Sequence, residues 1–236
     1  MYPIGLPCAV KGSGGASLAR RTASEAEETR EALIASAREL FTERGFAETP
    51  SGEIAERARV TRGALYHHFP SKRDLFAAVF ERLEAELDAA STAAARKVLA
   101  SGGNGLDAFA AGCRAFLRFA AAPDYHRIAL VDGLATLGPD RWHAIDARLG
   151  LATVESALAT LIERGEIEPI PERPLAVLIF GALNEAAFAL ARGERGVDTR
   201  GLIDALVALL GGGRAKGSRS PSRRRARPQG ARRRTP

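Results

Sequence analysis

The side chains of this sequence that could do chemistry gather in one short stretch. They are hydrogen-bond donors and small residues, in the order Arg59, Thr61, Arg62, Gly63, Ala64, Tyr66, His67 and Lys72. The forked guanidinium of Arg62 fits the major-groove edge of guanine, and it fits a phosphate equally well. Thr61, Tyr66 and Lys72 carry groups that donate to phosphate oxygens, and the two small residues let a backbone approach closely. The stretch predicts a contact surface for duplex DNA.

No group of residues has the composition and spacing of an active site. The sequence offers no Ser-His-Asp or Cys-His set, no glycine-rich phosphate loop and no paired carboxylates with a structural reason for their spacing. His67 and His68 are adjacent, so on a helix their side chains point about 100° apart and cannot share a metal ion. Cys113 falls on an apolar helical face and is expected to be a small core residue. We therefore expect no enzyme, no catalytic residue, no metal and no other cofactor.

Two short helices are needed to position the DNA-contacting stretch. Ser51 is the expected N-cap of the first, whose inward face carries Ile54 and two alanines. The second is expected over residues 62–68, capped by Thr61 and ended by Pro70, which disfavours a helical residue before it. An amphipathic helix that stops at a glycine precedes them. In a helix-turn-helix of this kind, the first turn of the second helix enters the major groove.

The rest of the chain reads as further helices, without the alternation typical of strands. A long helix is expected from residue 71 to about 99, followed by helical segments at about 106–117, 124–137, 140–148, 151–164, 173–192 and 198–210. The predicted fold class is all-α: a three-helix helix-turn-helix domain joined by the long helix to a larger helical domain. The expected organisation is a disordered leader at 1–23, a DNA-binding domain at 24–72, an effector-binding and dimerisation domain at 73–211, and a disordered Arg-rich tail at 212–236.

Net charge alone does not argue for a DNA-binding fold. The formal charge is +6, but residues 212–236 contain ten basic and no acidic side chains, and removing these ten leaves −4 for residues 1–211. No apolar run approaches the roughly 18 residues that a membrane span needs. The first residues also lack the pattern of a signal peptide. With two cysteines and no disulfide framework, we expect a cytoplasmic protein without a membrane partner.

The stretch from residue 29 to about 81 resembles the DNA-binding domain of the TetR family of bacterial repressors. The matching motifs are Leu40-Phe41, Gly45-Phe46, Ile54-Ala55 and the core Leu65-Tyr-x-x-Phe69-x-x-Lys72. Two departures from the family pattern stand out. Arg59 occupies the turn where the family commonly has glycine, so it must accept left-handed backbone angles. Pro50, Ser51 and Gly52 replace the usual cap, apolar and basic residues.

The resemblance implies a homodimer of two-fold symmetry that represses transcription at a palindromic operator and is released by an unidentified small-molecule effector. The dimer would pack through the helices at 151–164 and 173–192, and the apolar run 177–183 independently suits burial on two sides. Asn184 and Glu185 interrupt an apolar run and need partners in a ligand, across the dimer or within the protein. The expected effector pocket is lined by Phe109, Cys113, Phe116, His126, Trp142, Asn184 and Phe188. The alternative function is a sequence-tolerant, nucleoid-type DNA-binding protein that uses the basic tail.

Overall fold

The computed structural model describes the backbone of residues 14–211 and the side chains of residues 24–211. This part of the chain is helical and contains no strand, which confirms the all-α fold class. Its elements are α1 (Gly14–Arg44), α2 (Ser51–Arg57), α3 (Arg62–His68), α4 (Lys72–Ala100), α5 (Gly105–Ala120), α6 (Pro123–Tyr125), the π-helix η1 (His126–Asp132), α7 (Gly133–Leu137), α8 (Pro139–Glu163), α9 (Glu172–Ala191) and α10 (Thr199–Gly211).

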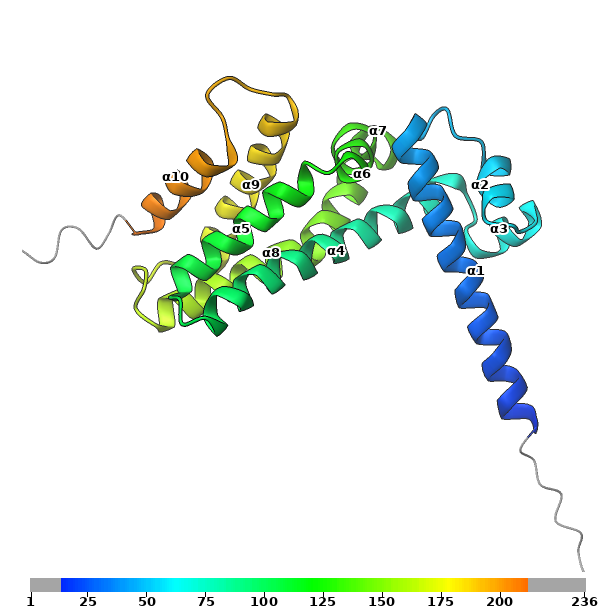
Figure 1. Cartoon of the computed structure of the whole chain (residues 1–236), viewed down its shortest axis with the longest axis horizontal. Helices are drawn as coiled ribbons and strands as arrows, with labels where there is room; N and C mark the ends of the chain where they lie inside the picture. The colour runs from blue at the N-terminus through cyan, green and yellow to red at the C-terminus, as the bar shows by residue number, and fades with distance from the viewer. Residues whose placement is uncertain (1–13, 212–236) are drawn as a thin grey trace, which may run out of the picture.

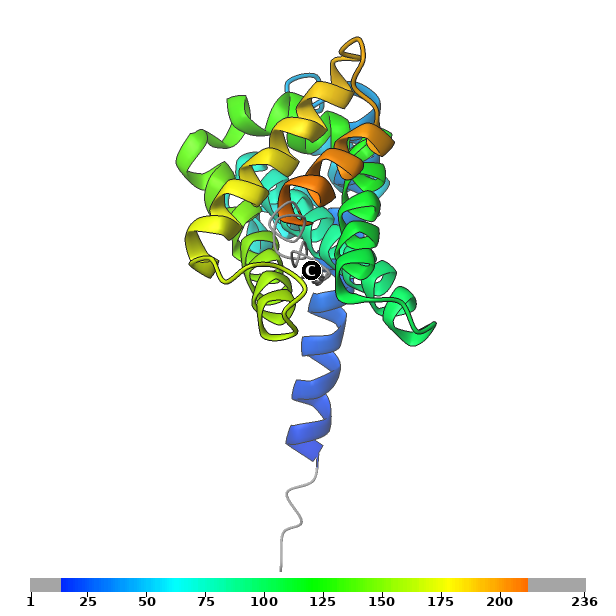
Figure 2. The same ribbon diagram turned by 90° about the vertical axis from the view of Figure 1, so that its left-hand side faces the viewer.

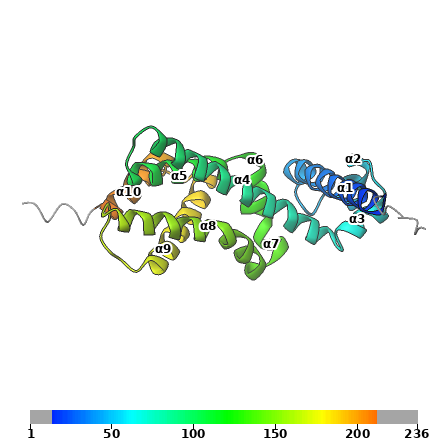
Figure 3. The ribbon, with the colours of Figure 1, turned by 90° about the horizontal axis from the view of Figure 1, so that it is seen from below.

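The helices form two lobes joined by α4. Helices α1 to α3 make a small lobe at one end of an elongated molecule, and α4 runs from it along the larger lobe (Figure 1). Seen from below, α4 and α8 extend along the larger lobe, with α5, α9 and α10 at its far end (Figure 3). Within this lobe α4 packs on α5 and α8, and α9 packs on α8 and α5. The architecture is therefore a small helical head on a helical body.

An aromatic cluster ties α4 to the small lobe. The ring of Phe76, from α4, lies 5.3 Å from the ring of Phe41 and 5.2 Å from that of Phe46. Ile54 and Leu65, from α2 and α3, are fully buried in the same core. Because Phe76 belongs to this core, the first turns of α4 move with the small lobe while its later turns belong to the body.

Helix α1 is longer than predicted. It begins at Gly14, so residues 14–23 of the leader expected to be disordered are helical. Residues 1–13 and the tail at 212–236 lie outside the described part of the chain. Its N-terminal half projects away from both lobes (Figure 2). Residues 14–28 are rich in Ala, Arg and Glu, which favour helix, but they present no apolar stripe. Hydrophobic periodicity finds only helices with an apolar stripe, so it did not indicate this segment.

Helix α8 is continuous where the sequence predicted two helices, at 140–148 and 151–164. The chain stays helical through Gly150. A Cβ atom built at Gly150 would lie only 2.5 Å from a ring carbon of Phe180, on α9. This glycine therefore serves close helix packing, and the helix continues through the gap left between the two predicted segments.

Two other segments differ from their predictions. The helix expected at 124–137 is divided into α6, η1 and α7, with wider π-helical turns in the middle. The expectation that no apolar run approaches membrane-spanning length was also wrong, because α9 passes a test of length and composition with a mean hydropathy of 1.7. Helices that pack in the core of a protein can have the same length and composition. In this fold α9 packs against α8 and α5.

Candidate DNA-binding surface and effector cavity

Helix α3 presents its first turn to solvent. Thr61 is its N-cap, and Oγ1 accepts a hydrogen bond from the backbone N–H of Ala64 at 3.1 Å, which confirms the predicted cap. Leu65 is fully buried and anchors the helix to the core of the small lobe. The predicted DNA-contacting residues that lie exposed are Arg59, Thr61, Arg62, Gly63, Tyr66 and His67, whereas Ala64 and Lys72 are half-buried. The helix thus offers most of these side chains on one accessible face.

The turn between α2 and α3 takes the conformation that the sequence required. Arg59 has a φ of 58°, so it adopts the left-handed angles expected of a residue that replaces glycine. The backbone N–H of Arg59 donates to the carbonyl of Glu56 at 3.0 Å, and that of Val60 donates to the carbonyl of Ala55 at 2.9 Å. The backbone alone closes the turn, which leaves the exposed guanidinium of Arg59 unconstrained beside α3.

The start of α2 adjoins this face. Ser51 was predicted as the N-cap of α2 but is its first residue, and the cap position is Pro50, which makes no side-chain cap hydrogen bond. Hydrogen bonds with Ser51 and then with Arg62 lower the pKa of the Tyr66 phenol. Tyr66 is 44% exposed. Ser51 therefore belongs to the candidate surface, a place that sequence reasoning missed because it depends on how α2 and α3 cross.

Lys72 is occupied by the protein itself. Its Nζ donates to the backbone carbonyls of Phe46 at 2.8 Å and Thr49 at 3.0 Å, and lies 4.2 Å from the centre of the Phe46 ring. Burial lowers the pKa of this ammonium group. Lys72 thus fastens the α1–α2 connection to the start of α4. A phosphate contact from its remaining N–H stays a prediction.

Two residues of η1 hold the C-terminal end of α1, and we call this contact the α1 latch. Asp132 Oδ2 accepts a hydrogen bond from the backbone N–H of Phe46 at 2.8 Å and one from Arg127 Nε at 3.3 Å. Arg127 Nη2 donates to the carbonyl of Arg44 at 3.2 Å. The Arg127 guanidinium occupies the space that a Cβ atom at Gly45 would need. The body therefore grips the end of α1 through a π-helix, an element often found at functional sites.

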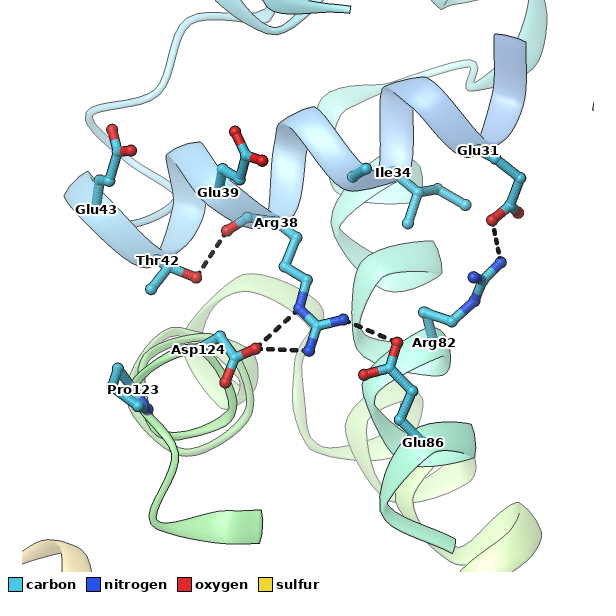
Figure 4. Close-up of a pocket in the computed structure, with 11 residues that line it drawn as sticks. Glu31, Ile34, Arg38, Glu39, Thr42, Glu43, Arg82, Glu86, Pro123 and Asp124 are labelled. Atoms are coloured by element: carbon cyan, nitrogen blue, oxygen red, sulfur yellow. Dashed lines mark hydrogen bonds and ion pairs between the residues drawn. The ribbon is translucent and has the colours of Figure 1, made fainter. Parts of the chain in front are cut away.

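A second contact between the lobes lies in a cleft of about 670 Å³ bounded by α1, α4 and α6. Arg38 reaches across it from α1: Nε and Nη2 donate to Asp124 Oδ2 at 2.9 and 2.6 Å, and Nη1 donates to Glu86 Oε1 at 2.8 Å (Figure 4). Arg82 of α4 pairs with Glu31 of α1 at the far side (Figure 4). The charged side chains in this cleft are used to join the head to the body.

A second, mostly apolar space lies within the body, and we call it the effector cavity after the role proposed for it below. It has a volume of about 600 Å³ and is bounded by α4, α5, α8 and α9. Phe109, Cys113 and Phe116, which the sequence placed in an effector pocket, line this cavity. Residues of α4, α8 and α9 that were not named from the sequence also line it, among them Leu87, Ser91, Thr153, Phe180 and Leu183. Burial raises the pKa of the Cys113 thiol to about 12, so this cysteine remains a neutral, apolar wall group.

Four residues assigned to the pocket from the sequence lie outside the effector cavity. They are His126, Trp142, Asn184 and Phe188. Trp142 is buried in the core, where its Nε1 donates to the carbonyl of Ala129 at 2.9 Å and its ring packs 6.3 Å from that of Phe188. Asn184 Nδ2 donates to Asp146 Oδ2 at 2.6 Å, so of its three possible kinds of partner the structure shows one within the protein. His126 begins η1, away from the cavity. Aromatic and polar types alone did not reveal which face of each helix meets the cavity.

One face of α9 is apolar and uncovered. Val177 is 51% exposed and Leu178 is 71% exposed. Gly181 and Ala182 follow them at the surface, and a Cβ atom built at Gly181 would meet no atom within 4 Å. Large exposed aliphatic side chains beside small residues give a flat surface suited to another helix.

Comparisons with known proteins agree with this geometry. Residues 33–79 match the sequence family described as "Bacterial regulatory proteins, tetR family", and residues 106–213 match "Tetracyclin repressor-like, C-terminal domain". The HTH-type transcriptional regulator AcrR of Shigella flexneri is 46% identical over 70 residues, which cover 30% of this chain and 33% of that protein. The HTH-type transcriptional repressor BepR of Brucella suis biovar 1 is 49% identical over 63 residues, covering 27% and 30%. The matches thus span about a third of these relatives.

Solved structures extend the likeness to most of the chain. The crystal structure of a TetR-family transcriptional regulator from Pectobacterium atrosepticum is 38% identical, covers 79% of this chain and 92% of its own, and superimposes with a TM-score of 0.64. RolR in complex with resorcinol is 23% identical, covers 80% and 90%, and gives a TM-score of 0.63, which shows a shared fold. Helix order, the exposed α3 and the extent of the 38% identical structure lead to one conclusion: this chain belongs to the TetR family of bacterial transcriptional regulators.

Proposed function

We propose that this chain is a homodimeric repressor that binds a palindromic operator through α3 and leaves it when a small molecule fills the effector cavity. One observation carries the proposal: α4 links the two ends of the molecule. Its Phe76 packs in the core beneath α3, and its Leu87 and Ser91 line the effector cavity. A rigid helix that belongs to both cores can transmit a change in one to the other.

The DNA-binding part of the proposal concerns residues 24–72. Arg62 stands in the exposed first turn of α3, where a helix-turn-helix contacts base edges, and we assign it base reading. Thr61, Tyr66 and Arg59 are exposed beside it and would contact phosphates. We give Ser51 the same role because it adjoins the Tyr66 hydroxyl. A regulator built this way acts where its DNA lies, which in a bacterium is the cytoplasm.

The body, residues 73–211, would supply dimerisation and effector binding. The uncovered face of α9, with Val177 and Leu178, supports packing against the same face of a second copy, as a two-fold dimer requires. Helix α8, which packs on α9, would complete a four-helix bundle. Two chains would then present two α3 helices for successive major grooves, about 34–36 Å apart.

Release from the operator would follow from a change in that spacing. A ligand shifts the equilibrium towards the released conformation only if it binds that conformation more tightly than the DNA-binding one. Occupancy of the cavity would displace the later turns of α4, and α6 and η1 would carry the change to α1 through Arg38 and the α1 latch. A movement of a few ångströms at α3 suffices, because both helices must fit the same duplex.

Selection of bound fragments from a random DNA pool tests the DNA-binding half of the proposal. We expect enrichment of an inverted repeat whose half-sites lie one helical turn apart. Sedimentation of the free protein tests the dimer: the wild type should sediment as a dimer, and Leu178→Glu should sediment as a monomer. The exposed Leu209→Glu, on α10, serves as the matched control and should remain dimeric. Enrichment of unrelated sequences, or a monomeric wild type, would refute the proposal.

A sequence-tolerant, nucleoid-type protein is the second candidate, favoured by the ten basic residues at 212–236. That tail would add affinity for any DNA at low salt. Comparing the full chain with a chain ending at residue 211 separates the two functions. A repressor keeps its preference for the selected operator without the tail, whereas a nucleoid-type protein loses most of its binding to every sequence.

A further inference from the structure

Three carboxyl groups mark the end of the effector cavity nearer the small lobe. Asp88 lines the cavity, and Glu84 lies one turn earlier on α4. Asp146 lies one turn before Gly150, which lines the cavity from α8. Because residues four apart share a helix face, Glu84 and Asp146 continue the two stripes that form the cavity walls. Both are almost fully buried, with exposed fractions of 3% and 1%.

Each carboxyl group accepts a hydrogen bond from a neutral donor. The donor and acceptor pairs are Tyr125 Oη to Glu84 Oε1 at 2.8 Å, Asn184 Nδ2 to Asp146 Oδ2 at 2.6 Å, and Thr153 Oγ1 to Asp88 Oδ1 at 2.6 Å. Asp146 Oδ1 is buried and has no hydrogen-bond partner among the described residues. The positive charge of His143 lowers the pKa of Asp146, but it gives Oδ1 no hydrogen bond. Leaving a buried carboxylate oxygen without a hydrogen-bond partner is costly, so this oxygen can accept a donor from outside the described chain.

The cavity itself has a distinct polarity. Its walls are mostly apolar, and Leu87, Phe109 and Phe116 contribute to them. Ser91 Oγ, one turn beyond Asp88 on the cavity wall, is buried without a hydrogen-bond partner in the described part of the chain. Among the described lining residues the basic one is Arg96, an exposed residue two turns along α4 from Asp88. An apolar cavity with carboxyl groups at one end and an unpaired hydroxyl one turn beyond Asp88 suits a molecule with one basic head group.

We propose that the effector is an organic cation with an apolar body, whose protonated amine lies beside Asp88, donates to Ser91 Oγ and stabilises the ionised forms of Glu84 and Asp146. The inference rests on the proposed function, since it gives a ligand class to the same cavity. Burial and the neighbouring carboxylates raise the pKa of Glu84 to about 8, and burial raises that of Asp146 to about 6. A bound cation favours the ionised form of both carboxyl groups, whereas an anionic ligand disfavours it.

The linkage to Tyr125 gives such a cation a route to α1. Tyr125 ends α6, and the next residues form η1, which carries the α1 latch. Asp124, beside Tyr125, accepts two hydrogen bonds from Arg38 of α1. A cation that draws Glu84 into its ionised form therefore acts on the same segment that holds the head to the body.

Three probes with one apolar body test the charge assignment on the full chain: phenylhexylamine, phenylhexanol and phenylhexanoate. Isothermal titration of the DNA-free wild type should rank their affinities as amine, then alcohol, then carboxylate. The amine should bind about tenfold or more tightly than the alcohol, as expected for a hydrogen bond to a charged group. Equal affinities, a preference for the carboxylate or no binding of the amine would each overturn the proposal. This comparison requires no variant.

A matched pair of substitutions locates the head group. Asp88→Asn keeps an acceptor for Thr153 but removes the charge, and should cost the amine about tenfold in affinity while leaving the alcohol unchanged. Asp140→Asn, at the exposed start of α8, should change neither. An amine affinity insensitive to Asp88→Asn contradicts the assignment. If the protein selects an operator but binds the three probes with equal affinity, only the cationic effector is refuted. If it prefers the amine but selects no operator, only the repressor function is refuted.

Discussion

Removing the carboxylate of the α1 latch should separate the head from the body at a defined cost. Asp132→Ala deletes the acceptor of the Phe46 N–H and the ion-pair partner of Arg127. A hydrogen bond to a charged group contributes about 1.5–3 kcal/mol, and a partly exposed ion pair adds at most about 1 kcal/mol. The Asp132 side chain is only 17% exposed, so water replaces these contacts poorly. We expect the free energy of unfolding to fall by about 2–3 kcal/mol.

Urea denaturation of the variant, with Asp140→Ala as an exposed control, measures this cost. The control should change the free energy of unfolding by less than about 0.5 kcal/mol. A double-mutant cycle with Arg127→Ala should yield a coupling of about 0.5–1 kcal/mol, because the pair is 3.3 Å apart and partly exposed. The same variant should also hold the operator at effector concentrations that release the wild type. A cost below about 0.5 kcal/mol, or an unchanged effector response, would refute the role given to the latch.

Three further changes test other parts of the structure. Arg59→Gly should raise the free energy of unfolding by about 1 kcal/mol in urea denaturation, because glycine adopts a φ of 58° without steric strain. The same variant should bind DNA more weakly in anisotropy titrations. A lower free energy of unfolding would show that Arg59 is not strained. Gly150→Ala should lower the melting temperature by several degrees, because the new Cβ atom would lie 2.5 Å from the Phe180 ring. An unchanged melting temperature would show that the ring can move away without cost. The pKa of the Glu84 carboxyl is raised to about 8, so the folded chain holds this proton more tightly than the unfolded chain does. The free energy of unfolding should therefore fall from about pH 5 to 8, by up to about 1 kcal/mol per pH unit. Glu84→Gln should flatten this slope in thermal melts across that range, and a slope equal to that of the wild type would exclude Glu84 as its source.

The local chemistry of the helix-turn-helix was predictable from the sequence. Thr61 caps α3, Arg59 takes left-handed angles and Leu65 is buried, as their types and spacing indicated. Each of these depends on residues only a few positions apart. Short-range rules of capping, turn geometry and periodicity therefore sufficed.

The body was less predictable because its features depend on contacts between distant segments. Gly150 lies between two segments that the sequence predicted as separate helices, whereas in the structure it lets α8 approach Phe180 closely. Trp142 and Asn184 have the types expected in a pocket, but each is turned to a partner within the core. Likewise Lys72 matches the DNA-binding motif, yet its ammonium bonds two carbonyls of the α1–α2 connection. A sequence pattern identifies a helix face, and only packing decides what that face meets.

Hydroxyl-radical footprinting on a fragment selected from random DNA tests the central claim most directly. A dimer that reads DNA through α3 should protect two patches related by two-fold symmetry and separated by one helical turn. Arg62→Ala, in the exposed first turn of α3, should abolish this pattern on the selected fragment while leaving weak, uniform protection. A single patch, or the same footprint from the wild type and Arg62→Ala, would contradict the account of a dimeric regulator that reads its operator through this helix.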